Sequence, residues 1–370
     1  MRDVCRLLMK FLTPLLIVLA VAIFAQAAGS DGSWWTVQTS GIDANLRGIS
    51  IGYQSGSGNK LVPVIWASGS NGVILQSADR GKSWKRIHVP DGDALDFRSI
   101  QAFDANTAYV MSIGEGDKSR IYKTVDGGET WSLQYKDQRS AIFLDALVCI
   151  SETRCFAVGD PIDGKFLLLT TLNGKDWKEL PRDGMPAALP EEGAFAASGT
   201  CLAIYGDRDL YITTGGPAAR VFHSPDLGQT WTVAEIPIAS GTASSGSFSI
   251  VRAGDSVVAV GGDYKEVKVH DRVAAYSLDQ GATWHPAARQ PGGFRSAVAW
   301  VPDAYLMAVG PEGEDVSLDK GEHWTRAGSL NLNALSAASN FSEGAWAVGP
   351  KGTIAYSAFQ NSHKDPGRRH

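Results

Sequence analysis

Three arginines stand second in similar short segments: Arg47 in Leu-Arg-Gly-Ile, Arg98 in Phe-Arg-Ser-Ile and Arg295 in Phe-Arg-Ser-Ala. A guanidinium group holds carboxylates through forked hydrogen bonds, so arginines that share one space would suit an acidic ligand or partner surface. The alternative is structural, because arginines also extend to water or pair with nearby acids such as Asp145. The sequence alone allows both interpretations.

Acidic residues supply the candidates for catalysis. A glycosidase of the common type needs two carboxylates about 5 to 9.5 Å apart across one cleft. Asp145 can be nominated for this role with Glu192 or with Asp160. Asp160 and Asp163 lie three residues apart, but two carboxylates without further oxygen donors are weak evidence for calcium.

A second polar group combines an acid, a phenol and an amine in one loop, at Asp263, Tyr264 and Lys265, and Asn333 adds an amide elsewhere. The seven histidines show no metal-ligand spacing, and the sequence contains no nucleophile elbow, phosphate loop or dinucleotide fingerprint. The sequence therefore predicts neither a metal site nor a cofactor.

A repeat must position these residues. The motif Ser/Thr-x-Asp-x-Gly-x-x-Trp occurs five times, with its aspartates at Asp79, Asp126, Asp226, Asp279 and Asp319. A sixth copy, from Thr171 to Trp177, is one residue short and has Asn173 in place of Asp. The tryptophans of the six copies follow one another at intervals of 40 to 54 residues. That interval is typical of a four-stranded propeller blade.

The motif has a local physical explanation. The aspartate can accept hydrogen bonds from the turn amides and from the Ser or Thr hydroxyl, and the glycine can take the positive φ that closes the turn. The tryptophan can pack between neighbouring sheets. We expect these aspartates to be structural, because carboxylates spread around a ring cannot converge on one reacting atom.

The strand pattern predicts an all-β fold, a seven-bladed β-propeller of four-stranded blades. Each motif turn joins the third strand of its blade to the fourth. The last unit, from Leu332 to Ser357, lacks both a motif and an outer strand, whereas Trp34 to Gln38 near the other end forms an unassigned strand. This predicts that the N-terminal strand joins the last blade and closes the ring.

The repeat resembles the Asp-box (BNR) superfamily. Within it, the chain looks most like proteins related to the photosystem II stability and assembly factor. The resemblance rests on segments such as Phe97-Arg-Ser-Ile and Ile121-Tyr-Lys-Thr-Val-Asp-Gly-Gly-Glu-Thr-Trp131. It implies a seven-bladed propeller that acts as a binding or assembly platform, and leaves the partner open.

Propeller topology assigns a site to one face. The Asp-box turns lie at one end of the strands, so the longer loops and the starts of the inner strands lie at the other. Near their starts, the seven inner strands are expected to carry Arg47, Arg98, Asp145, Ala196, Ser249, Arg295 and Asn333. We predict binding there through the three arginines, Asp145 and Asn333, together with the loop from Asp263 to Lys265.

The function predicted from these features is a non-enzymatic scaffold that binds a protein partner, as a monomer. The alternative is a glycoside hydrolase, sialidase-like or glucan-cleaving, that acts on a carbohydrate through Asp145 and Glu192. The three arginines favour a sialidase, because sialidases hold the substrate carboxylate with an arginine cluster. However, Leu-Arg-Gly-Ile at Arg47 lacks the proline of the sialidase pattern, and no pair of a tyrosine nucleophile and a supporting glutamate can be placed from the spacing.

The ends of the chain predict export. Residues 1–27 combine a charged start, an apolar run and Ala-Gln-Ala, which is typical of a secretory signal peptide. A single propeller domain is expected over residues 28–359, without a membrane span, followed by a disordered basic tail over 360–370. The chain is therefore assigned to the periplasm or the extracellular space. The net charge of −5 gives no reason to expect nucleic acid.

Export permits disulfides, and three cysteines follow the signal peptide. Cys149 and Cys155 flank a turn-like segment and could form a bridge across one hairpin, or remain two unlinked thiols. Cys201 would be left over as a small core residue.

Overall fold

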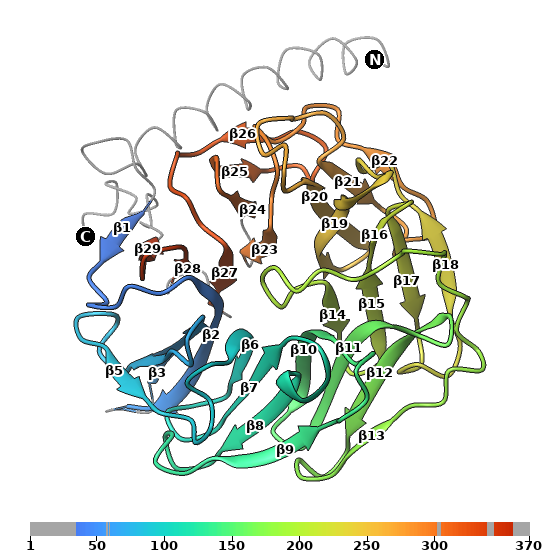
Figure 1. Cartoon of the computed structure of the whole chain (residues 1–370). Helices are drawn as coiled ribbons and strands as arrows, with labels where there is room; N and C mark the ends of the chain where they lie inside the picture. The colour runs from blue at the N-terminus through green and yellow to red at the C-terminus, as the bar shows by residue number, and fades with distance from the viewer. Residues whose placement is uncertain (1–34, 57, 59, 302–304, 339–343, 358–370) are drawn as a thin grey trace, which may run out of the picture.

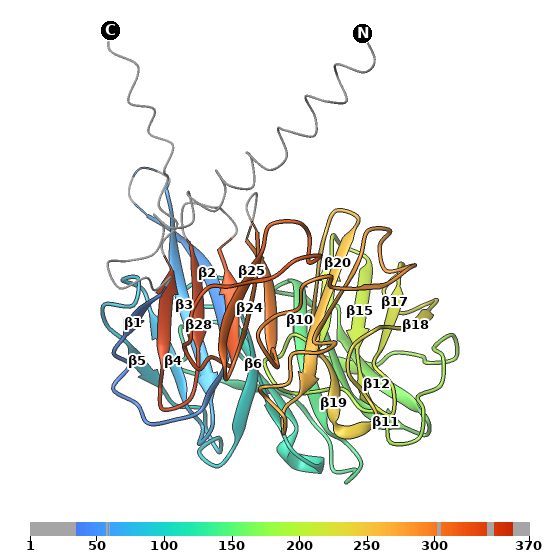
Figure 2. The ribbon, with the colours of Figure 1, turned by 90° about the horizontal axis from the view of Figure 1, so that it is seen from above.

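The computed structural model describes residues 35–56, 58, 60–301, 305–338 and 344–357. Within these residues the chain forms seven antiparallel sheets arranged as the blades of a ring (Figures 1 and 2). The seven-bladed propeller predicted from the repeat is therefore confirmed. The predicted signal peptide, residues 1–27, and the predicted tail, residues 360–370, lie outside the described residues.

The blades are numbered along the chain. The strands of each blade are named in their order in the sheet, from the strand nearest the axis to the outermost one. Blade 1 contains β2 (Leu46–Ser55), β3 (Leu61–Gly69), β4 (Ile74–Ser77) and β5 (Lys85–Ile87). Blade 2 contains β6 (Asp96–Ala102), β7 (Ala108–Ile113), β8 (Arg120–Thr124) and β9 (Ser132–Lys136), with a short 3-10 turn, η2 (Gly116–Lys118), between β7 and β8. Blade 3 contains β10 (Leu144–Ser151), β11 (Arg154–Ile162), β12 (Lys165–Thr171) and β13 (Trp177–Glu179).

Blade 4 contains β14 (Leu202–Tyr205), β15 (Asp209–Thr213), β17 (Arg220–Ser224) and β18 (Thr232–Glu235). Blade 5 contains β19 (Thr242–Ala253), β20 (Ser256–Asp263), β21 (Ala274–Ser277) and β22 (His285–Pro286), and β16 (Gly215–Gly216) pairs with the inner side of β19. Blade 6 contains β23 (Ala297–Val301), β24 (Tyr305–Gly310), β25 (Gly313–Ser317) and β26 (Thr325–Arg326). Blade 7 contains β27 (Ala334–Ala337), β28 (Ala345–Val348) and β29 (Ile354–Ser357), with β1 (Thr36–Gln38) outermost.

The strand β1 belongs to the last blade rather than the first. It pairs antiparallel with β29, with Val37 opposite Ala355. Blade 7 thus takes three strands from the C-terminal part of the fold and one from the N-terminal part. This pairing covers the edge that β29 would otherwise expose.

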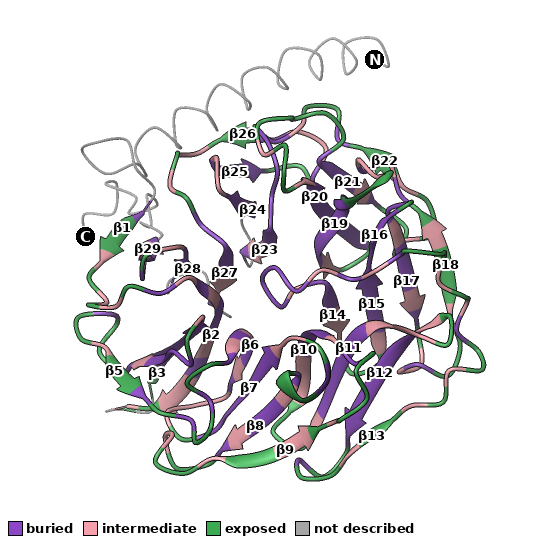
Figure 3. Cartoon of the chain, in the orientation of Figure 1, coloured by how far each residue is buried: buried purple, intermediate pink, exposed green. Residues whose placement is uncertain are grey.

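Apolar clusters between neighbouring blades hold the ring together. Trp66 of blade 1, for example, packs with Phe97 and Tyr122 of blade 2. Figure 3 shows the resulting pattern, in which the middle strands of the blades are largely buried and the outermost strands are largely exposed. Because burial of one such large side chain contributes about 1.5–3 kcal/mol, each interface between blades adds substantially to stability.

The Asp-box turns have the predicted hydrogen bonds. In blade 1, Ser77 Oγ donates to Asp79 Oδ1 at 2.8 Å, Ser83 N donates to the same oxygen at 3.0 Å, and Ser83 Oγ donates to Asp79 Oδ2 at 2.6 Å. These bonds lower the pKa of Asp79 to about 2. Gly81 has a φ of +78°, and a Cβ there would lie 2.6 Å from the ring of Trp346 in blade 7. The turn therefore requires glycine.

The short sixth copy forms a different turn. Asn173 Oδ1 accepts hydrogen bonds from Lys175 N and Asp176 N, both at 2.9 Å, and Asn173 Nδ2 donates to Asp176 Oδ2 at 2.8 Å. Trp177 still packs edge-on against Tyr109 of blade 2, at 6.3 Å between ring centroids. The packing role survives the missing residue.

The pairing of the cysteines follows one of the two alternatives left open by the sequence. Cys149 and Cys155 face each other across β10 and β11 and form a disulfide. Cys201 is a buried free thiol.

Within the described part of the chain, no helix is both long and apolar enough to span a bilayer.

Candidate functional site

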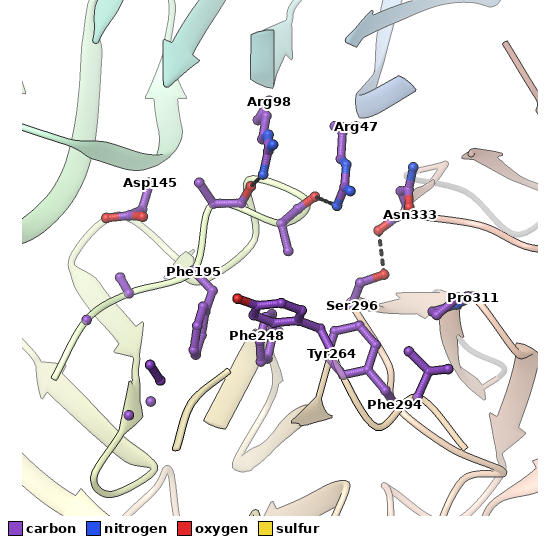
Figure 4. A pocket seen from close by; sticks show the side chains of 18 of the residues that line it. Arg47, Arg98, Asp145, Phe195, Phe248, Tyr264, Phe294, Ser296, Pro311 and Asn333 are labelled. Atoms are coloured by element: carbon purple, nitrogen blue, oxygen red, sulfur yellow. Dashed lines mark hydrogen bonds between the residues drawn. The ribbon is translucent and has the colours of Figure 1, made fainter. Parts of the chain in front are cut away.

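A cavity of about 790 Å³ opens at the centre of the ring (Figure 4). The inner strands of blades 1, 2 and 3 bulge at one residue near their starts, and these residues, Arg47, Arg98 and Asp145, line the cavity. In blade 1, β2 and β4 both run antiparallel to β3, and β4 ends at its Asp box. The start of β2 therefore lies at the opposite end, and the cavity opens away from the Asp boxes.

One segment of the chain crosses the inside of the ring. Residues 195–200 precede β14 and reach toward the axis (Figure 1). The carbonyl of Ala196 accepts a hydrogen bond from Arg98 of blade 2 at 3.0 Å, and Ser198 Oγ donates to the carbonyl of Ser296 beside blade 6 at 2.8 Å. We call residues 195–200 the crossing segment. Ala196 was expected at the start of an inner strand; it lies instead in this segment, and β14 begins only at Leu202.

Arg98 is already engaged within the protein. Its Nε and Nη2 both lie 2.8 Å from Asp96 Oδ2, and its Nη1 donates to Ala196 as described above. The guanidinium thus ties blade 2 to the crossing segment while it lines the cavity.

Arg47 has a similar role. Its Nη1 donates to the carbonyl of Ala197 at 3.4 Å, and the amide of Asn45, when its oxygen faces the guanidinium, accepts from Nε at 3.1 Å and from Nη2 at 3.2 Å. Burial, followed by the like charge of Arg98, lowers the pKa of Arg47 to about 10. Arg47 therefore stays charged at neutral pH.

Arg295 does not line the cavity. Its amide donates to the carbonyl of Gly261 in blade 5 at 3.0 Å, and Leu46 and Leu332 make the matching bond to the blade before them. Arg295 is therefore equivalent to the buried Leu46 and not, as expected, to Arg47, which faces the cavity. The position that faces the cavity is taken by the next residue, Ser296.

The guanidinium of Arg295 is fully buried and is neutralised locally. Its Nε donates to Asp315 Oδ2 at 2.8 Å, its Nη2 contacts the same oxygen, and its Nη1 donates to the carbonyl of Phe294 at 2.9 Å. The structure supports the structural interpretation for this arginine.

Blade 5 also shows a shift of one residue, but in the opposite direction, because the residue that faces the cavity precedes the expected one. Ser249, expected to face the cavity, is buried, and its Oγ accepts hydrogen bonds from Thr200 Oγ1 at 2.7 Å and from Val298 N at 3.0 Å. Phe248 occupies the bulge and lines the cavity. Asn333 also lines the cavity, and its Nδ2 donates to the carbonyl of Leu46 at 2.8 Å.

Asp145 differs from the arginines because it has no partner. The residue is 1% exposed, and among the described residues no hydrogen-bond donor reaches either carboxylate oxygen. Burial raises the pKa of Asp145 well above its usual value; the charge of nearby Asp160 adds to this effect, and Arg98 opposes it. Asp160 also lines the cavity and accepts one bond, from Ala194 N at 3.1 Å, and burial raises its pKa to about 6.

Aromatic rings form another part of the wall (Figure 4). Phe195 stacks on Phe248 with centroids 3.8 Å apart, and Phe294 meets Phe248 edge-on at 4.8 Å. Tyr264 lies 6.2 Å from Phe248 and is 47% exposed. We call these four residues the aromatic cluster.

The remaining predicted residues are placed outside this cavity. Asp263 accepts hydrogen bonds from Thr242 Oγ1 at 3.2 Å and from Lys265 N at 2.9 Å, and neither Asp263 nor Lys265 is among the described lining residues. Glu192 is buried; its Oε1 accepts from Thr214 Oγ1 at 2.6 Å and from Arg220 Nε at 2.8 Å. It lines an adjoining hollow of about 530 Å³, which shares Asp160, Glu191 and Gly193 with the central cavity.

The sequence did contain a signal for the two shifted positions. Residues that face the cavity precede a small residue and then an aliphatic one, as Arg98 does in Arg-Ser-Ile. Phe248 in Phe-Ser-Ile and Ser296 in Ser-Ala-Val fit that rule. Phe195 and Phe294 come from segments before strands, where no repeat marks them.

Comparisons with known proteins bear on this fold. A family described as the DUF6242 beta propeller domain matches residues 57–302. The Photosystem II assembly protein Ycf48 of Synechococcus sp. (strain JA-2-3B'a(2-13)) is 26% identical in an alignment of 191 residues that covers 42% of this chain and 54% of the relative. The Photosystem II assembly lipoprotein Ycf48 of Synechococcus sp. (strain CC9902) is 27% identical over 100 residues, 27% of each chain.

Xyloglucanase Xgh74A of Acetivibrio thermocellus is 25% identical in an alignment of 187 residues that covers 43% of this chain and 21% of the enzyme. The matched region thus spans 21% to 54% of these relatives' lengths.

Two solved structures share the architecture. A structure of Ycf48 bound to a D1 peptide has a TM-score of 0.61 and 14% identity, and covers 88% of this chain and 97% of that one. Virginiamycin B lyase from Staphylococcus aureus has a TM-score of 0.60 and 10% identity, with 88% and 100% covered. At these identities the likeness shows the fold alone, and that fold serves both a peptide-bound protein and an enzyme.

Proposed function

This chain belongs to the DUF6242 beta-propeller domain family, and on that premise we propose that it is a non-enzymatic scaffold that holds a protein partner in its central cavity. The observation that carries the proposal is the cavity, which is open at the end away from the Asp boxes and combines charged side chains with an aromatic cluster. Concave sites of this size and mixed polarity are where proteins usually bind ligands.

The similarity to Ycf48 supports a binding or assembly role. In the related solved structure, Ycf48 is bound to a D1 peptide, which makes an extended segment of a partner a reasonable occupant here. We propose such a segment without transferring the photosystem, since the matched relatives are covered only in part.

We also propose that the protein works outside the cytoplasm. The sequence pattern of residues 1–27 supports export. The disulfide between Cys149 and Cys155 supports an oxidising compartment, because such bonds are rare in the cytosol.

The hydrolase alternative is less well supported. Xyloglucanase Xgh74A speaks for it, since a related sequence occurs in a glycan-cleaving enzyme. Of the two nominated pairs, Asp145 and Asp160 both line the central cavity. The geometry speaks against the other pair, Asp145 with Glu192, because Glu192 is bound by Arg220 and Thr214 and lines the adjoining hollow. In a substrate screen, Asp145→Asn and Glu192→Gln should each abolish any glycan cleavage if that pair were catalytic.

The proposal is tested by closing the cavity. Ala243 is exposed and lines it, so Ala243→Trp should obstruct entry, while Ala78→Trp places the same ring on an exposed Asp-box turn as a matched control. We expect Ala243→Trp to lower partner recovery at least about tenfold in a cross-linking pull-down from the exported fraction, the change expected for a loss of about 1.4 kcal/mol. Equal recovery by both variants would contradict binding in the cavity.

A further inference from the structure

The charged groups of the cavity differ in whether their bonding capacity is used. Arg98 is held by Asp96 and the crossing segment, and Arg47 by Asn45 and the same segment. Asp145 is buried, lines the cavity and has no donor at either oxygen within the described structure. A buried carboxylate without donors is costly, so the cavity favours a ligand that supplies N–H donors and positive charge.

We propose that the cavity binds a protonated primary amine, with its ammonium group at Asp145 and Asp160 and its hydrocarbon part against the aromatic cluster. This inference rests on the proposed function, because it specifies what the same cavity recognises. An ammonium group offers three donors, enough for the two free oxygens of Asp145 and for Asp160, which accepts a single bond. Aromatic faces attract cations and also pack against the alkyl stem.

An anionic ligand suits the cavity less well. A carboxylate would have to displace Asp96 or the crossing-segment carbonyls from the two arginines and would lie near two acids. Leaving those carbonyls and Asp96 without their donors costs free energy that a new ion pair must first recover.

Protons should leave when the amine binds. Among the described residues, Asp145 interacts electrostatically with Asp160 from the end of β11, Arg98 from β6 and the thiol of Cys201 before β14. Arg47 and Glu191 are charged residues that also line the cavity. Burial keeps the pKa of Asp145 high and that of Asp160 at about 6. A bound ammonium group stabilises the charged forms of both carboxyl groups. The affinity for the amine should therefore rise as the pH increases through 6, and binding should release protons.

Two sources could provide the amine, a lysine side chain on a partner segment or a free alkylamine. Pentylammonium serves as the probe for the shared chemistry, with pentanol as its neutral counterpart and pentanoate as its anionic one. A peptide with one central lysine, compared with the same peptide carrying norleucine, separates the two sources.

Calorimetric titration of the full chain tests the proposal. Pentylammonium should bind at least about tenfold more tightly than pentanol or pentanoate. The Asp145→Asn variant should bind pentylammonium at least about tenfold more weakly than the wild-type chain, as expected for loss of a charge-assisted hydrogen bond. Asp207→Asn, an exposed aspartate remote from the cavity lining, should change nothing. Titrations of the wild-type chain in buffers of different ionisation enthalpy should show proton release.

Two further variants distinguish loss of the amine site from loss of folding and from failure of the scaffold proposal. Tyr264→Leu alters only the half-exposed rim of the aromatic cluster and should weaken pentylammonium about two- to fivefold, so the test survives if Asp145→Asn fails to fold. Preference for pentanoate, or pentylammonium affinity unchanged in the Asp145 and Tyr264 variants, would overturn the amine site. Amine binding that persists while Ala243→Trp still recovers a partner would overturn the scaffold proposal alone.

Discussion

The two ends of the propeller use the same side chain in opposite ways. At the Asp-box end, the carboxylates are exposed or half-buried and surrounded by donors, and Asp79, Asp126 and Asp279 have their pKa lowered to about 2, chiefly by hydrogen bonds from the residue four positions on. At the cavity end, Asp145 is buried and Asp160 half-buried, one donor reaches the pair within the described residues, and burial raises the pKa of both. The carboxylates with donors stabilise turns, whereas Asp145 and Asp160 have the free acceptor capacity on which the proposed amine site rests.

The cavity end also contains charges that are fully satisfied, and these give the comparison its control. Arg295 and Asp315 are both buried and bonded to each other. If the state of bonding decides the role, this pair should behave like the Asp boxes although it lies near the cavity.

The largest effect is therefore expected at Asp315. Asp315→Ala leaves the Arg295 guanidinium buried without its counter-ion, which should reduce the free energy of unfolding by about 3–5 kcal/mol. Urea unfolding measures the change. The double variant Arg295→Met with Asp315→Leu should lose less than Asp315→Ala alone, because no unpaired charge remains. A loss below about 1 kcal/mol in the single variant would show that the pair is not structural.

The same contrast explains what the sequence could predict. The Asp-box turns, the blade count and the strand for blade 7 are local or periodic features, so the spacing of Ser77, Asp79 and Trp84 was enough to place them. Which side chains face the cavity depends on the register of each inner strand. Phe294-Arg295-Ser296 resembles Phe97-Arg98-Ser99 in sequence, but its strand pairs one residue further along the chain, so Ser296 faces the cavity in place of Arg295.

The crossing segment was not predictable from the repeat. Residues 195–200 interrupt the pattern where blade 4 should begin, and their bonds reach the arginines of other blades. Whether Arg47 and Arg98 are free for a ligand depends on these distant carbonyls, which no local motif encodes. Asp145 could be nominated from its position, but its lack of donors is visible only in three dimensions.

A second prediction compares the two kinds of aspartate directly. Asp226 accepts hydrogen bonds from Ser224 Oγ at 2.9 Å, Thr230 N at 2.7 Å and Thr230 Oγ1 at 2.6 Å. Asp226→Ala should therefore cost about 1 kcal/mol, a value kept small by solvent screening, and leave amine binding intact. Asp145→Asn should leave the thermal midpoint at pH 7 equal or higher, since it removes a buried carboxyl without donors. A lower midpoint for Asp145→Asn than for Asp226→Ala would reverse the comparison.

The smallest effect is a change in how stability depends on pH. The Asp79 pKa is about 2 in the folded chain against 3.8 for an unperturbed aspartate, so its contribution is present above pH 3.8 and disappears as the pH falls through 2. The Asp160 pKa is about 6, so its contribution is greatest below pH 3.8 and is lost as the pH rises through 6. Thermal midpoints measured from pH 2 to 8 should accordingly fall at both ends of the range. Asp79→Asn should make only the acidic limb shallower, because Asp126 and Asp279 still titrate there. Asp160→Asn should make only the limb near pH 6 shallower, because it removes one of the raised carboxyl groups. If Asp160→Asn changed the acidic limb instead, the Asp160 carboxyl would be titrating like those of the Asp boxes, and the two ends of the propeller would not differ as described.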